Sequence, residues 1–388
     1  MSNLGTQYDV AVIGAGPAGS SSAIRLANAG LNVILIEKAK FPREKLCGEF
    51  ISPECRPHFD ELGLNGQIAA AHGTDIRETV FYANSGRSVA VPNEWFGSIG
   101  APALGLSRAE MDARLLDRAA ELGVEVIEET SAAGLLFDNE RVSGLTIKNA
   151  DKNGSSIRAK VTVDATGRSR VLERYIGKGG KANGKAAEFV AFKTHLTGAK
   201  TTDDTCEIYG YRGGYGGCVR VENGYHNLCF IVSSREVKRV GSDPEHVLRQ
   251  IVCTNPRAAE VLGAASVAKP WLAVPIEGYG RGKLVPASGL IAVGDAGAFI
   301  DPFTGSGILM ALESGKIAAA AIIEGLESFS TVASLYRAKH SATFDRRFRT
   351  SSILRRAAFV PFAAELTVGA LTLSSGLRRR LARATRAS

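Results

Sequence analysis

The sequence predicts an α/β protein of two lobes, one built around a parallel sheet and the other an α+β lobe with a mainly antiparallel sheet. Three observations lead to this prediction. The chain opens with a strand, a glycine turn, a helix and a second strand within residues 8–38. A strand, turn and helix recur within residues 290–324, and the region between them holds short β-type runs. A length of 388 residues also exceeds what one core of ordinary size holds.

The opening stretch has the pattern of a dinucleotide-binding βαβ unit. An apolar run at residues 9–13 leads into Gly14, Gly16 and Gly19, which have the G-x-G-x-x-G spacing. The first glycine permits a tight turn, the second lets backbone approach a pyrophosphate, and the third lets the helix lie close to the strand. Glu37 ends the second strand and is positioned to bind a ribose hydroxyl. The predicted contact residues of this unit are Gly14, Gly16, Pro17, Ala18, Gly19, Glu37 and Lys38.

The next stretch, residues 41–54, reads FPREKLCGEFISPE. Following such a βαβ unit, its P-R-x-K-x-C-G pattern resembles the geranylgeranyl reductase family. That family is a branch of the p-hydroxybenzoate hydroxylase-like flavoproteins, which also include monooxygenases and flavin-dependent halogenases. The resemblance implies FAD as the cofactor, bound by a Rossmann-like lobe of the glutathione reductase and p-hydroxybenzoate hydroxylase type. It also implies that Arg43 contacts FAD and that Cys47 and Gly48 lie near the isoalloxazine ring.

Cys47 is therefore a candidate catalytic residue. The alternative is a thiol that only fills a small apolar gap, since free cysteines are among the most buried residue types. No histidine lies near Cys47 in the sequence to activate it, so we expect it to tune the flavin reaction rather than to form a covalent intermediate.

Residues 75–92 alternate apolar and polar side chains around a turn, which predicts a hairpin that begins the second lobe. Ser107 and Glu110 have the spacing of a capping box and predict a helix that continues to Gly123. Arg108, in the first turn of that helix, resembles the flavin-contacting arginine of the family. A cation is disfavoured there by the helix dipole, which supports a phosphate or ribose role over a solvated side chain. Residues 124–127 predict another parallel strand.

Two β-type runs lie at residues 141–148 and 156–164, and the second ends in the segment DATGR. This ending resembles the point at which these flavoproteins return to the nucleotide, and it adds Asp164, Ala165 and Gly167 to the implied cofactor contacts. The Asp-Gly pair usual in hydroxylases is missing here, and no second G-x-G-x-x-G unit occurs. We therefore expect NAD(P)H to bind transiently, or a separate reductase to deliver electrons.

Four runs, at residues 188–196, 206–211, 216–221 and 226–233, predict the substrate sheet. Geranylgeranyl reductases have a Tyr-x-Trp-x-x-Pro motif in this region, and halogenases have Trp-x-Trp-x-Ile-Pro. This chain has Gly217 in place of the tryptophan and Arg220 in place of the proline, which argues against halogenation and leaves the substrate open. Tyr215 is a candidate catalytic residue that faces the pocket, or else an ordinary aromatic of a sheet.

A second family mark, LIAVGDAGAFIDPFTGSGI, covers residues 290–308. A buried strand ends in Gly294 and Asp295, and the carboxylate of Asp295 resembles the ribityl ligand of the family. The turn then enters a helix at residues 308–324, whose N-terminus can stabilise negative charge on a reduced flavin. The implied cofactor contacts here are Gly294, Asp295, Pro302, Gly305, Gly307 and Ile308.

The positive charge of the chain lies at its C-terminal end. The whole chain carries a net charge of +8, whereas residues 337–388 hold 12 Lys and Arg against Asp345 and Glu365, a net charge of +10. The apolar segment within them, residues 357–373, contains Pro361 and is a poor membrane span. We expect a packed C-terminal helix with a solvated basic end. Contact with an anionic membrane surface is the alternative, and nucleic acid is not expected because no aromatic residues interleave the arginines.

The six cysteines form no C-x-x-C pair, so we predict reduced thiols and no metal site. The start of the chain has no basic region of a signal peptide, which predicts a cytoplasmic protein, or one peripheral at the inner face of the membrane. We expect a discontinuous FAD-binding domain (residues 1–74, 100–175 and 285–338), a substrate-binding domain (75–99 and 176–284) and a basic C-terminal helical segment (339–388).

The expected function is that of an FAD-dependent oxidoreductase of the geranylgeranyl reductase type, acting on a lipophilic isoprenoid or polyketide-like compound. An FAD-dependent monooxygenase is the main alternative. A halogenase and a flavin-bound binding protein without turnover are less favoured alternatives. NAD(P)H or an electron-donor protein would supply the electrons.

Overall fold

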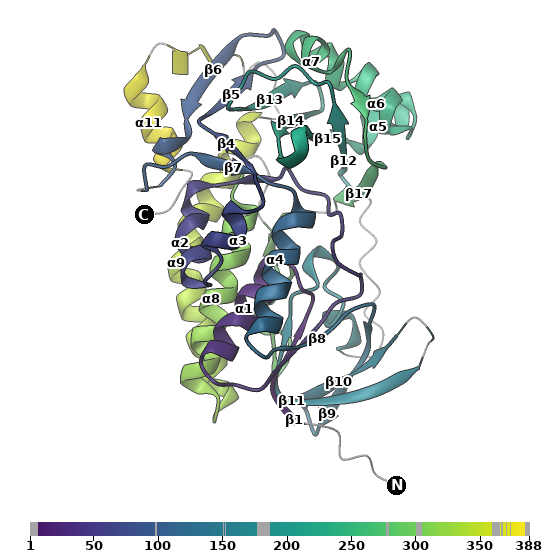
Figure 1. The fold of residues 1–388 in the computed structure, drawn as a ribbon, viewed down its shortest axis with the longest axis vertical. Coiled ribbons are helices and arrows are strands. Elements are labelled where there is room, and N and C mark those ends of the chain that lie inside the picture. Colours follow the sequence, from purple (N-terminus) through teal and green to yellow (C-terminus); the bar gives the residue numbers. More distant parts are fainter. Residues whose placement is uncertain are drawn as a thin grey trace.

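The computed structural model of the protein describes residues 7–97, 99–149, 151, 153–176, 187–276, 279–299, 305–358, 365, 368–369, 371–372 and 374–384. They form two lobes (Figure 1). The lower lobe in this view holds a parallel sheet and the long helices, and the upper lobe holds a second sheet with short helices.

The sheet of the first lobe is centred on β1 (Gln7–Ile13), which pairs in parallel with β2 (Val33–Ile36) and with β11 (Gly154–Asp164). Two further parallel strands extend it, because β8 (Glu125–Ile127) lies beside β2 and β19 (Leu290–Ala292) lies beside β11. Strands buried on both faces need apolar side chains throughout, which explains the apolar runs of β1 and β2.

Helices cover one face of this sheet. Its buried valines and leucines pack against four helices, which are α1 (Pro17–Asn28), α4 (Arg108–Glu121), α8 (Gly307–Gly325) and α9 (Phe329–Ala358). The other face packs against the antiparallel strands β9 (Ser131–Asp138) and β10 (Arg141–Lys148), which continue the sheet from β11. The carboxyl ends of the parallel strands thus remain for a ligand.

The second lobe is built on a sheet of eight strands, and every pairing in it is antiparallel except that of β13 with β5. In spatial order the strands are β16 (Ser266–Val267), β12 (Phe189–Thr197), β15 (His226–Ser233), β14 (Gly214–Arg220), β13 (Thr205–Tyr211), β5 (Glu78–Tyr82) and β6 (Ser88–Pro92), with β17 (Leu272–Ile276) also paired to β12. The mainly antiparallel sheet predicted for this lobe is therefore confirmed.

The two faces of this second sheet have different partners. Side chains such as Phe192 and Leu196 of β12 pack against the helices α5 (Ser234–Val240), α6 (Pro244–Gln250) and α7 (Pro256–Leu262). Because side chains alternate along a strand, their neighbours Ala191, Lys193 and His195 point to the opposite face, toward the first lobe. This face carries the site described below.

Short elements join the lobes and complete the first one. They are a three-stranded sheet of β3 (Phe50–Ile51), β7 (Ala103–Gly105) and β4 (Thr74–Ile76), the helices α2 (Arg56–Glu61) and α3 (Asn65–Ala69), and the pair β18 (Gly280–Arg281) with β20 (Ala298–Phe299).

Local signals in the sequence were reliable. The predicted hairpin appears as β5 and β6, and the helix predicted after Ser107 is α4, whose cap is the Ser107 Oγ that accepts a hydrogen bond from the Glu110 amide at 3.2 Å. The predicted boundary between the FAD-binding domain and the C-terminal segment, at residue 338, lies inside the continuous helix α9. Tyr336 of α9 donates a hydrogen bond to the Ala292 carbonyl at 2.7 Å and Phe344 is fully buried, so α9 packs in the first-lobe core on both sides of that position.

The C-terminal end packs on the β5–β6 hairpin. The Glu365 carboxylate accepts hydrogen bonds from the amide and hydroxyl of Ser85, both at 2.8 Å, and Val368 and Leu371 are buried against the hairpin. The final helix, α11 (Ser375–Ala384), lies beside β6, where an Arg378 nitrogen donates to the Ala90 carbonyl at 3.2 Å. Within the described part of the chain, no helix combines the length and apolar character needed to cross a bilayer.

Candidate functional site

Three turns meet at the carboxyl edge of the parallel sheet. Gly14 follows β1 with a φ of +102°, a conformation that suits glycine, and a Cβ there would lie 2.4 Å from the Ala165 carbonyl oxygen after β11. Gly294 follows the end of β19, and a Cβ on it would lie 2.9 Å from the Cβ of Ala18 in α1. The structure therefore brings the predicted turns around residues 14–19, 164–167 and 294–295 together.

The glycines of this edge fall into two groups. A Cβ on Gly14 or Gly19 would strike backbone, at 2.4 Å and 1.9 Å, so these two residues let the chain pack against itself. A Cβ on Gly48, Gly167 or Gly307 would meet nothing within 4 Å, and one on Gly16 would meet only an Arg108 nitrogen at 3.7 Å. At the second group the backbone is open to its surroundings, so a ligand such as FAD could approach it closely.

Glu37 lies at the end of β2, where an acid that binds ribose is expected. It is 4% exposed, and its two carboxylate oxygens accept hydrogen bonds from the amides of Ala15 at 3.0 Å and Ala39 at 3.1 Å. The carboxylate thus also fixes the glycine turn, and each oxygen keeps a lone pair for a further donor.

Four cations lie close enough to one another to interact electrostatically beside Glu37, and we call Lys38, Arg43, Lys45 and Arg108 the basic cluster. The fully buried Asp112 holds two of them. It accepts from an Arg43 nitrogen at 2.8 Å and from two Arg108 nitrogens at 2.8 and 2.7 Å. The buried Nε of Arg43 has no hydrogen-bond partner. This excess of positive charge beside a glycine turn fits the pyrophosphate of FAD.

The pKa of Lys45 reflects the other members of the basic cluster. Burial and, after it, the nearby Arg43 charge lower this pKa to about 8, with Glu37 opposing. Bound pyrophosphate would favour the ammonium form, so above pH 8 FAD binding should take up a proton. We expect the dissociation constant for FAD to rise on the order of tenfold between pH 7.5 and pH 9.5. Fluorescence titration at constant ionic strength measures this change. Lys45→Gln should remove most of it, and an equally steep profile in that variant would contradict the assignment.

The remaining predicted cofactor residues lie around the second glycine-rich turn. Burial raises the pKa of Asp295, while Arg168, Arg108 and Arg170 act in the opposite direction. Burial likewise raises the pKa of Asp164, which accepts from the hydroxyl and amide of Thr166 at 2.6 and 2.9 Å.

The turn continues into α8. The Gly294 amide donates to Ser314 Oγ in α8 at 2.8 Å. Gly305 has a φ of +61°, and Ile308 is buried in the first turn of α8. Pro302 lies outside the described residues.

Both predicted catalytic residues lie between the lobes. The Cys47 carbonyl accepts from Asn227 Nδ2 of β15 at 3.0 Å, and its thiol interacts with the Arg108 guanidinium. Tyr215 is buried in an apolar group that includes Leu46 from the Cys47 loop and Phe299 from the first lobe. The other members of that group are Phe189, Ala191, Ile231, Ile276 and Tyr279. Tyr215 thus lies on the face of the second sheet that covers the first lobe.

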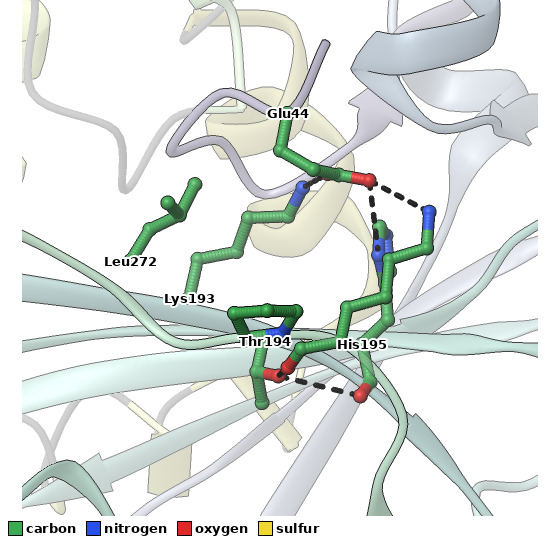
Figure 2. A pocket seen from close by; sticks show the side chains of 7 residues that line it. Glu44, Lys193, Thr194, His195 and Leu272 are labelled. Carbon is green, nitrogen blue, oxygen red and sulfur yellow. Dashed lines mark hydrogen bonds and ion pairs between the residues drawn. The ribbon is translucent and has the colours of Figure 1, made fainter. Parts of the chain in front are cut away.

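A buried charged group in the loop around Cys47 and on the facing strand β12 was not predicted from the sequence. Figure 2 shows Glu44 with Lys193 and His195 pointing toward it. Lys193 Nζ lies 2.6 Å from Glu44 and 2.7 Å from Glu49, and His195 Nε2 lies 2.6 Å from the other Glu49 oxygen. Lys269 completes the group, with its Nζ 2.6 Å from Glu44. The sequence offered only a weak signal, because Lys193 and His195 occupy alternate positions of a strand whose other side chains are apolar or threonine.

The charges of this group balance one another. Burial disfavours the Glu44 carboxylate, but hydrogen bonds from Lys193 and Lys269 prevail and lower its pKa to about 2. Burial also disfavours the Lys193 ammonium, but the Glu49 and Glu44 carboxylates prevail and raise its pKa. The ligand atoms of Glu44, Glu49 and His195 lie within 4.8 Å of one another, as in a metal site. The Lys193 ammonium already lies between the two carboxylates, and we therefore interpret the group as an ion network.

Comparisons with known proteins show the family to which the chain belongs. A family model described as an FAD binding domain matches residues 7–256. The digeranylgeranylglycerophospholipid reductase of Methanosarcina acetivorans is 31% identical over 326 residues, which cover 83% of this chain and 76% of the relative. The menaquinone reductase of Mycobacterium tuberculosis is 30% identical over 368 residues, which cover 91% and 83%. A solved flavin-dependent brominase has the same fold, with a TM-score of 0.81, 23% identity and coverage of 98% and 93%. The chain belongs to the geranylgeranyl reductase-like family of FAD-dependent oxidoreductases.

Proposed function

We propose that the protein reduces carbon–carbon double bonds of a lipophilic compound of isoprenoid type. The observation that carries this proposal is the apolar group around Tyr215, which lies against the Cys47 loop where the resemblance places the flavin ring. Apolar side chains beside the flavin ring suit a substrate without polar groups and would exclude water from the reacting bond. Two relatives are named as reductases of a glycerophospholipid with geranylgeranyl chains and of menaquinone, both lipophilic compounds.

FAD, when bound, supplies the exchange of two electrons as a hydride equivalent. The residues of the chain bind and orient it. In this proposal the glycine turn and the basic cluster hold the pyrophosphate, Glu37 holds the adenosine ribose, and Asp295 holds the ribityl chain. Tyr215 and its apolar neighbours orient the substrate, and Cys47 tunes the reaction. Electrons come from NAD(P)H that binds transiently, or from an electron-donor protein.

The stoichiometry of NAD(P)H, oxygen and product in the purified protein tests this function. Under anaerobic conditions, with a geranylgeranyl lipid as the probe, a reductase should saturate one double bond for every two electrons delivered, that is, for every NAD(P)H oxidised. Oxygen consumption coupled to hydroxylation would instead show a monooxygenase. A chain that retains FAD but turns over no candidate substrate with any reductant would be a flavin-bound binding protein.

Cys47→Ala should bind FAD with an affinity close to that of the unchanged protein, because the pyrophosphate contacts lie elsewhere. We expect the rate or product distribution to change, while dithionite still reduces the bound flavin, since the thiol carries no electrons in that step. A substrate adduct trapped on Cys47 during turnover would contradict this role. Unchanged kinetics would support the gap-filling alternative.

We further propose that the basic C-terminal segment binds an anionic membrane surface on the cytoplasmic side, which would bring the protein to a lipophilic substrate. Arg379 and Arg380 of α11 are exposed. Replacing both with glutamine should weaken binding to phosphatidylserine liposomes roughly 30-fold, at about 1 kcal/mol per charge. Co-sedimentation measures this binding, and Lys160→Gln on β11 is a matched control at an exposed position in the other lobe. Equal binding by all forms would leave the arginines only a packing role.

A further inference from the structure

We propose that Glu49 is a positioning residue for Cys47, through which side chains of the second sheet fix the Cys47–Gly48–Glu49 turn against the first lobe. The inference rests on the proposed function for its effect on turnover, whereas its effect on the thiol can be measured without FAD.

The backbone at Glu49 is held in an uncommon conformation. Its φ is +54°, in the left-handed region, which is unfavourable for a residue with a side chain. Glu49 is also 0% exposed. A strained, buried, charged residue persists only where its surroundings determine it fully, and such residues cluster at functional sites.

The contacts of Glu49 reach three different segments. One carboxylate oxygen accepts from Lys193 Nζ at 2.7 Å and from the Arg108 amide at 2.9 Å, and the other lies 2.6 Å from His195 Nε2. Its own amide donates to Cys47 Sγ at 3.4 Å, and its carbonyl accepts from the Leu106 amide at 3.3 Å. Glu49 therefore links β12, the start of α4 and the thiol.

The other end of the turn is held from the same sheet. Asn227 donates to the Cys47 carbonyl at 3.0 Å and lies opposite His195 in the β12–β15 pairing. Lys193 and His195 of β12 therefore contact one end of this three-residue turn, and Asn227 of β15 contacts the other. A small displacement of this sheet relative to the first lobe would shift the thiol.

Proton transfer through the same group is a weaker explanation. Close contacts run from the partly exposed Lys269 and Glu44, at 34% and 28%, through Lys193 to Glu49. The contact between Glu49 and the Cys47 sulfur, however, comes from the backbone amide and not from the carboxylate. A backbone amide orients a sulfur atom but does not pass on the proton of a side chain.

The test is the rate at which iodoacetamide alkylates Cys47, followed by peptide mass spectrometry so that the other cysteines do not interfere. Glu49→Ala and Asn227→Ala should each change this rate at least threefold, in the full chain with and without FAD, and alter the visible circular dichroism of the flavin. The dissociation constant for FAD should stay within about threefold. Glu49→Gln, which keeps the size of the side chain, should restore part of the original rate.

Glu44→Gln is the matched control, because it removes a carboxylate from the same network without touching the turn. It should alkylate at the rate of the unchanged protein. Folded Glu49→Ala and Asn227→Ala proteins with an unchanged alkylation rate would overturn the proposal. If Glu49→Ala does not fold, Asn227→Ala decides alone, because it removes no charge. Unchanged protein that never retains flavin would refute the proposed function instead, and the comparison without FAD would still stand.

Discussion

Gly16→Val should abolish tight FAD binding while leaving the ligand-free protein folded. The backbone at Gly16 is extended, with φ −77°, so valine is sterically allowed there. A Cβ at this position meets only an Arg108 nitrogen at 3.7 Å, and the new side chain enters the predicted pyrophosphate path. We expect a loss in affinity of about 100-fold or more, roughly 3 kcal/mol, in a fluorescence titration.

Two other glycine substitutions serve as controls for this result. Gly66→Val also adds a side chain into open space, on the exposed helix α3, and should leave FAD binding unchanged. Gly19→Val should prevent folding, because its Cβ would lie 1.9 Å from the Gly14 carbonyl oxygen. Undiminished FAD occupancy in folded Gly16→Val protein would refute the placement of the pyrophosphate.

Asp112→Asn should strongly destabilise the FAD-free protein. Asp112 is 0% exposed and is the carboxylate to which both Arg43 and Arg108 donate. Without its charge, the Arg108 guanidinium loses its counter-ion and Arg43 keeps Glu37 at 3.6 Å, which together costs about 3 kcal/mol. FAD should restore part of this stability, since its pyrophosphate supplies negative charge to the same cations. Urea unfolding with and without FAD measures both effects.

Asp117→Asn on the same helix is the control, because Asp117 is exposed and should change the free energy of unfolding by less than about 0.5 kcal/mol. An Asp112→Asn protein that loses less than about 1 kcal/mol would show that the two arginines do not depend on this carboxylate.

Much of the first lobe was readable from the sequence because its signals are local. The G-x-G-x-x-G turn, Glu37 and the capping box at Ser107 each act over a few residues or one βαβ unit, so spacing along the chain fixes their geometry. The resemblance then supplied FAD, the Cys47 loop and the Asp295 turn. The strands of the second lobe followed from alternation and turn residues.

Only the tertiary structure decided how the lobes meet. Glu49 lies 144 residues before Lys193 and 146 before His195 in the chain. Their contact depends on the register of β12 with β15 and on how the second sheet packs against the loop after β2. The positions of these residues along the chain predict neither the register nor the packing, because a lysine and a histidine in a strand are equally compatible with an exposed edge. The sequence alone thus determined the cofactor fold, whereas the packing of the lobes decided which side chains surround Cys47.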